Sequence, residues 1–124
     1  MSPRSEEFMV QARERAKAAH EILAAGHLEV AVSVAYYAML NAARAALSED
    51  DEHSRTHRGT WHLFHDRYVA TGAFDEDLHA LATSAQRTRE RGDYEAITPA
   101  PAEAGKVVEG ASDFVGAVER MLEV

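Results

Sequence analysis

A chain of 124 residues fits one domain, residues 1–124, which is large enough to bury a hydrophobic core. Its net charge of -8 argues against a protein that coats nucleic acid generally, which needs a basic surface, but leaves room for a small basic site. Without cysteine there is no disulfide and no thiolate ligand or nucleophile. The charged start, MSPRSEEF, and the lack of a membrane-length apolar run favour a cytoplasmic protein that binds no membrane.

Five amphipathic segments are predicted as helices, and no strand pattern competes with them. In residues 4–25 and 27–48, apolar side chains recur at the three- to four-residue spacing of a helix face. The second of these segments is apolar on two faces, which is typical of a helix at the centre of a bundle. The other segments are residues 56–71, residues 75–91 and a last helix that opens at Thr98-Pro99. Short connections between them predict an all-α fold, an antiparallel bundle of about five helices.

The stretch RTRERGDYEA, residues 87–96, concentrates three arginines at the end of the fourth segment. We expect Gly92 to follow the end of that helix and to open a loop, GDYEAI. At 100° per residue, Arg89 continues the apolar stripe of its helix, whereas Arg87 and Arg91 point towards solvent. The three arginines are therefore not equivalent, and Arg89 is the inward one.

An inward arginine at the end of a helix has two interpretations. It can be architectural, because a cation favours the negative end of the helix dipole and Asp93 can neutralise it. It can also line a polar cleft, in which Tyr94 adds a ring or a hydroxyl group and Asp93 orients the guanidinium. The pattern alone leaves both open.

Three stretches, in this order, resemble the HEPN (higher eukaryotes and prokaryotes nucleotide-binding) domain family, and in particular its short, stand-alone prokaryotic members. The stretches are AVSVAYYAMLNAARAAL (31–47), THRGTWHLFHDRYVATGAFDEDL (56–78) and RERGDY (89–94). The resemblance implies a helical bundle that commonly forms a homodimer and binds RNA or a nucleotide. It also implies a minimal nucleotidyltransferase as partner, in a toxin–antitoxin or defence pair. We predict no cofactor.

Many HEPN proteins are metal-independent ribonucleases whose motif is an arginine followed a few residues later by a histidine. Arg89 stands where the arginine is expected, but the last histidine of the chain is His79, and Tyr94 stands where the histidine would be. With a pKa of about 10, tyrosine is a poor base at neutral pH. Three functions remain: a binding protein, a ribonuclease that uses Arg89 with Tyr94 or His57, and a structural interaction module.

The stretch THRG adds Thr56, His57 and Arg58 as candidate ligand-binding residues, because it resembles a family motif at a helix start. A threonine cap with exposed backbone N–H groups can hold an anion, although Thr56 can equally be a cap and nothing more. The histidines of this segment lack a HExxH pattern and a clear third ligand, so we predict no metal site.

Other polar groups lie on the second segment. We expect Tyr36 and Tyr37 to be core or dimer-face aromatics rather than ligand contacts. Asn41 and Arg44 are candidates for polar groups that face a cleft or a dimer seam.

Overall fold

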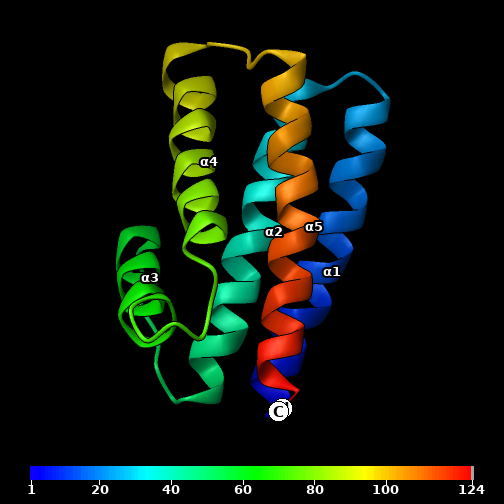
Figure 1. Cartoon of the computed structure of the whole chain (residues 1–124). Helices are drawn as coiled ribbons and strands as arrows, with labels where there is room; N and C mark the ends of the chain where they lie inside the picture. Colours follow the sequence, from blue (N-terminus) through cyan, green and yellow to red (C-terminus); the bar gives the residue numbers. More distant parts are fainter. Residues whose placement is uncertain (124) are drawn as a thin grey trace.

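The computed structural model describes residues 1–123, and within that range it contains five α-helices and one π-helical turn. In chain order these elements are α1 (Pro3–Ala24), α2 (Leu28–Glu49), α3 (His57–Phe64), η1 (His65–Val69), α4 (Glu76–Glu95) and α5 (Pro101–Leu122). No strand occurs among these residues, which confirms the predicted all-α helical bundle. Figure 1 shows the long helices α1, α2 and α5 packed together, with α4 beside them and the short α3 at one flank.

Helix α2 lies at the centre of the bundle and contacts each of the other four α-helices. Seven of its twelve buried residues are alanines, and small side chains let neighbouring helices approach closely. By length and composition α2 is the one helix in residues 1–123 that could span a membrane, but 67% of its most apolar window is buried inside the bundle. Packing against four helices therefore accounts for its apolar composition.

An aromatic cluster centred on Phe64 joins α3 and η1 to the rest of the bundle. The ring centroid of Phe64 lies 4.9 Å from that of Phe74, 5.0 Å from that of Tyr68 and 5.6 Å from that of Phe114. Trp61 meets Phe114 edge-on at 5.9 Å. Aromatic pairs in such arrangements each add about 0.5–1.5 kcal/mol beyond the area they bury. The cluster fixes α3 against α5, and with it the start of α3.

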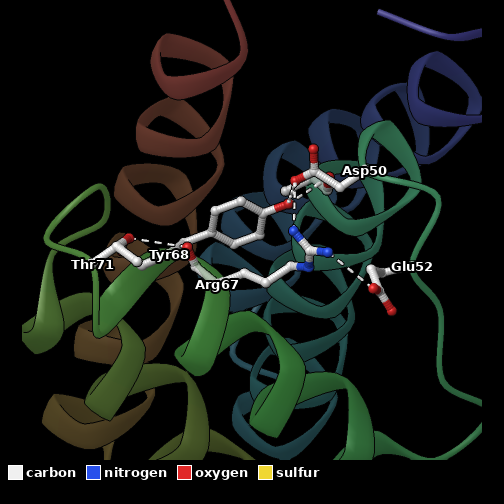
Figure 2. A network of polar contacts seen from close by, with 6 residues as sticks. Asp50, Glu52, Arg67, Tyr68 and Thr71 are labelled. Carbon is white, nitrogen blue, oxygen red and sulfur yellow. Dashed lines mark hydrogen bonds and ion pairs between the residues drawn. The ribbon is translucent and has the colours of Figure 1, made fainter.

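A polar network, drawn in Figure 2, anchors η1 to the end of α2. The hydroxyl of Tyr68 donates to the carboxylate of Asp50 at 2.5 Å, and the carbonyl oxygen of Ala46 lies 2.8 Å from the same hydroxyl. Burial, and then this hydrogen bond to Asp50, raise the pKa of Tyr68, so its hydroxyl keeps its proton. Arg67 adds a hydrogen bond of 3.0 Å to the carboxylate of Glu52. The network thus holds η1 against the end of α2 and the segment that follows it.

The third helical segment is less regular than predicted. Instead of one α-helix over residues 56–71, α3 ends at Phe64 and continues as a π-helical turn to Val69. The turn closes with a bond from the backbone N–H of Ala70 to the carbonyl of His65 at 2.8 Å. A π-helical turn holds an extra residue and so rotates the side chains that follow it. This rotation was not visible in the apolar spacing.

The fourth helix is longer than predicted, because Gly92 does not end it. The helix continues until Ala96, which adopts the left-handed conformation with φ 55° and ψ 34°. A Cβ at position 92 would lie 2.9 Å from a carboxylate oxygen of Glu29, so the glycine allows a close approach between α4 and α2. The predicted loop GDYEAI is therefore wrong, and Asp93 and Tyr94 lie in the last turn of α4.

The fifth helix begins at Pro101, with Ala100 as its N-cap, rather than at Thr98-Pro99. Proline fits the first turn of a helix because the missing N–H would have no helical partner there. The glycines within α5 do not interrupt it. At Gly110 a Cβ would lie 2.5 Å from a methyl carbon of Leu81 on α4, whereas nothing lies within 4 Å of a Cβ at Gly105.

These two glycines give a matched test of the α4–α5 packing. Gly105→Ala should leave the free energy of unfolding unchanged or raise it by up to about 1 kcal/mol, because alanine favours the helix. Gly110→Ala should be less stable than Gly105→Ala by about 1–3 kcal/mol, the usual cost of overpacking. Chemical denaturation of both variants measures the difference. Equal stabilities would mean that α4 and α5 are not in close contact at Gly110.

Candidate functional site

Arg89 lies on the inward face of α4, as its helical phase predicts. Its side chain is 14% exposed, and Nη1 donates to the carboxylate of Asp93 at 2.6 Å. The guanidinium lies over two tyrosine rings of α2, with Cζ 5.4 Å from the ring centroid of Tyr36 and 5.5 Å from that of Tyr37. Cation–π contacts of this kind stabilise a partly desolvated cation. The guanidinium of Arg89 is thus held in one position, and Asp93 pairs with its Nη1.

The remaining nitrogens of Arg89 are not used by the protein. Nε is the one buried side-chain nitrogen or oxygen without a hydrogen-bond partner in the described part of the chain. Nη2 also has no partner there, and it is not among the buried atoms. A buried donor without a partner is unfavourable, because it has lost its water. Arg89 therefore keeps hydrogen-bonding capacity that the folded protein does not satisfy.

Arg87 and Arg91 are exposed, in agreement with their phase. Arg91 lies 3.4 Å from the carboxylate of Glu103 at the start of α5. Tyr94 is 82% exposed and lines a hollow of about 450 Å³ together with Arg87 and Arg91. Tyr94 and Arg89 thus occupy different faces of α4, and the structure does not bring this proposed pair together.

The stretch THRG forms the start of α3. The hydroxyl of Thr56 accepts a hydrogen bond from the backbone N–H of Gly59 at 2.9 Å, so it acts as the N-cap. A Cβ at position 59 would overlap the side-chain oxygens of Thr56 and Ser54, which explains the glycine. Arg58 is exposed and forms no ion pair within residues 1–123, whereas His57 is half-buried. Of the three predicted residues Thr56, His57 and Arg58, only His57 has a side chain that contacts α2.

His57 reaches the same pair of tyrosine rings as Arg89. Its ring centroid lies 5.6 Å from that of Tyr36 and 5.7 Å from that of Tyr37. Burial lowers the pKa of His57, and the positive charges of Arg44 and Arg89 lower it further. The imidazole is therefore neutral at pH 7. Two residues that are 32 positions apart in the sequence, His57 and Arg89, thus meet on one aromatic surface of α2.

A short hydrogen-bonded chain determines which nitrogen of His57 carries the proton. Trp61 Nε1, which can only donate, bonds to the hydroxyl oxygen of Tyr36 at 3.1 Å. The Tyr36 hydroxyl lies 3.1 Å from Nδ1 of His57. Tyr36 is 0% exposed, and burial raises its pKa to about 12, so it stays protonated. Its proton has His57 Nδ1 as its acceptor, which leaves the imidazole proton on Nε2.

The hydrogen-bonding role of Tyr36 and Trp61 was missed at the sequence level. Tyr36 was expected in the core, and it is buried there, but its hydroxyl also orients His57. One signal was available: a buried tyrosine or tryptophan generally finds a partner for its polar atom. Arg44, noted earlier as a polar group on α2, is near enough to lower the pKa of His57.

The site offers cations and hydrogen-bond donors rather than metal ligands. Within residues 1–123 no group of three or more acidic or histidine side chains is arranged to hold a metal ion. Arg89 Nη2 and His57 Nε2–H are donors without protein partners in this range, and Arg44 adds positive charge. Such a set suits an anion with several acceptor oxygens.

The proton position on His57 is testable by NMR. In the wild type, long-range ¹H–¹⁵N spectra should give the Nε2–H tautomer of neutral His57 and a pKa below about 6.5. Tyr36→Phe should yield a mixture of tautomers, because Nδ1 loses its donor. Arg89→Ala should raise the pKa of His57, since removing a positive charge favours the protonated ring. Exposed His27 is the internal control. A wild-type Nδ1–H tautomer would contradict this assignment.

A comparison with a protein family covers the whole of this site. A family model described as HEPN domain matches residues 5–121. The chain is also 34% identical over 94 residues to the UPF0332 protein glr0978 of Gloeobacter violaceus (strain ATCC 29082 / PCC 7421). That alignment covers 76% of this chain and 75% of the relative. The family match includes α2, α3 and α4, and therefore every residue described around Arg89.

Proposed function

Because the chain belongs to the HEPN family, we propose that it binds RNA and holds a phosphate group of the RNA at Arg89. One observation carries this proposal: Arg89 combines an ordered, mostly buried guanidinium with an accessible nitrogen, Nη2, that the protein leaves unpaired. Charge-assisted hydrogen bonds from a guanidinium to a phosphate are stronger where water is scarce. Asp93 holds Nη1 at 2.6 Å and so orients the remaining donors.

The surroundings of Arg89 suit a phosphodiester. His57 supplies a neutral imidazole with a proton on Nε2, which is a donor and not a competing anion. Arg44 increases the local positive potential, although the whole chain carries a net charge of -8. A local basic site in an acidic protein favours a ligand that is bound in one place over diffuse attraction along nucleic acid.

Single substitutions of the three arginines separate a specific site from diffuse attraction. Arg89→Ala should weaken binding of a fluorescent octauridylate by about 1.5–3 kcal/mol, the range for hydrogen bonds to charged groups. Arg87→Ala and Arg91→Ala are matched controls from the same helix and should have much smaller effects. Fluorescence anisotropy at fixed salt measures the affinities, and thermal melts verify folding. Equal small losses in all three would indicate diffuse attraction. A folded Arg89→Ala protein with normal binding would make the arginine architectural.

A metal-independent ribonuclease is the second candidate, because His57 and Arg89 contact the same two tyrosines. Arginine can stabilise charge on the phosphate, and a histidine can take the ribose 2′-hydroxyl proton. The hydrogen bond from Tyr36, however, occupies the lone pair on Nδ1, and Nε2 carries the proton. Neutral His57 in this state is a donor rather than a base, which favours binding over cleavage.

We therefore expect little RNA cleavage by the isolated protein in EDTA. A gel assay should give the same rate for the wild type, His57→Ala and Arg89→Ala. Cleavage by the wild type that disappears in both variants would promote the ribonuclease function. Cleavage that persists in both variants would be a contaminant or would come from another site.

Assembly into a homodimer is part of the same proposal. Large apolar side chains are exposed where α2 begins and α4 ends: Val30 is 52% exposed and Ile97 is 49% exposed. Glu29 packs against Gly92 at this end of the bundle, so the two helix ends adjoin. Light scattering should give a dimer at roughly tens of micromolar, the weak end for a specific interface. A Val30→Glu variant should shift it towards monomer, and a monomeric wild type would contradict the proposal.

A minimal nucleotidyltransferase partner, in a toxin–antitoxin or defence pair, is proposed from the family resemblance alone. Co-purification of the two proteins from cells that express both would support the pairing. A protein that binds such a partner but no RNA would be the structural interaction module of the third hypothesis.

A further inference from the structure

A second basic pocket, of about 350 Å³, lies between the start of α1, the end of α2 and the segment that leads to α3. Three arginines line it: Arg4, Arg44 and Arg55. None of the three forms an ion pair within residues 1–123. The one carboxylate in the lining, Glu52, is bound to Arg67 at 3.0 Å. The lining therefore carries three arginines against one carboxylate, and Arg67 already binds that carboxylate.

Two of the three arginine side chains are restricted in their movement before any ligand binds. The guanidinium of Arg4 lies over the ring of Phe8, with Cζ 5.2 Å from the centroid, which limits the movement of this long side chain. Arg44 is half-buried on α2. Arg4 also lines two neighbouring hollows, one with Glu7 and one with Asp51. The most strongly cationic part of the pocket is therefore the part around Arg44 and Arg55. Unpaired cations that share a pocket repel one another, and a bound anion relieves that repulsion.

The pocket adjoins the site around Arg89. Arg44 lines the pocket, and its charge also lowers the pKa of His57. The segment from Arg55 to His57 joins the two regions along the chain. On α2, Arg44 lies seven residues after Tyr37, on which Arg89 rests, so the two levels are about 11 Å apart along the helix. A short single strand held at Arg89 can therefore extend to this pocket.

We propose that Arg4, Arg44 and Arg55 form a second phosphate-binding site for single-stranded RNA, which takes a phosphate farther along the strand than the one at Arg89. This inference rests on the proposed function, because Arg89 defines where the strand is first held. It gives the protein a preference for oligonucleotides over mononucleotides. The pocket would bind the phosphate backbone of the RNA and would not distinguish between bases.

The test compares one long and one short probe on the full chain. Octauridylate can reach both sites, whereas uridine monophosphate can occupy only one. The variants are Arg55→Gln, Arg4→Gln and, as the control with the same charge change, Lys17→Gln. Lys17 is exposed on α1, about 20 Å along the helix from Arg4. Arg44→Gln is measured as an additional variant only, because Arg44 is half-buried and its replacement can also change stability. Thermal melts verify that each variant folds.

Arg55→Gln and Arg4→Gln should each bind octauridylate about tenfold more weakly than the wild type. The slope of log affinity against log salt should fall by about 0.7 for each lost phosphate contact. Lys17→Gln should change neither the affinity for octauridylate nor the salt slope appreciably. None of these three variants should change the affinity for uridine monophosphate. Losses no larger than that of Lys17→Gln would overturn the second site.

Two further outcomes separate this inference from the proposed function. If Arg89→Ala loses octauridylate binding and Arg55→Gln does not, the second site is wrong and the function at Arg89 stands. If Arg55→Gln weakens uridine monophosphate as much as octauridylate, the pocket is an independent nucleotide site and the strand-spanning proposal is overturned. Normal octauridylate binding by Arg89→Ala would refute the proposed function itself.

Discussion

A phenol hydroxyl that is buried completely inside a helical bundle must find hydrogen-bond partners, because burying it unpaired costs about 1–3 kcal/mol. Tyr36 is in that position on α2. Its partners, Trp61 and His57, both come from α3, so satisfying one hydroxyl fixes the distance and the rotation of α3 against α2. The same ring carries the guanidinium of Arg89 from α4. Three helices thus meet at one tyrosine, and the site is a product of that packing.

The two ends of α3 are held by different chemistry. At its start, the Thr56 cap and the bond from Tyr36 to His57 place a polar residue at the protein surface. Beyond its end, the hydroxyl of Tyr68 bonds to the last turn and the C-cap of α2, and Phe64 packs into the aromatic cluster. Because both ends are attached, α3 cannot pivot without breaking buried contacts. His57 is therefore positioned by the core as well as by its local backbone.

The sequence predicts the fold well because the apolar spacing of the helices is strong and strand patterns do not compete. It also predicts the inward phase of Arg89, which depends on local geometry alone. The predicted end of α4 was wrong. A glycine after a helical stretch usually marks the end of the helix, but Gly92 is needed for close packing against Glu29 within it. Since the helix continues, Tyr94 lies five residues after Arg89 and about 140° around the axis. That rotation separates the two residues.

The meeting of His57 with Arg89 was not predictable, because it depends on how α3 docks. Tyr36 and Trp61 are 25 positions apart, and nothing in their spacing indicates that one donates to the other. The pocket of Arg4, Arg44 and Arg55 draws its residues from two helices and a connecting segment, so it too exists only in the folded chain.

The unpaired Nε of Arg89 has a consequence for how this protein balances stability against function. A buried donor without a partner costs about 1–3 kcal/mol, which the tyrosine rings beneath it offset in part. A long apolar residue such as methionine would fill the same space without that cost. The chain therefore keeps a side chain that its fold alone would not favour. If the proposed phosphate binds at Nη2, its binding free energy would offset part of this cost in the bound protein.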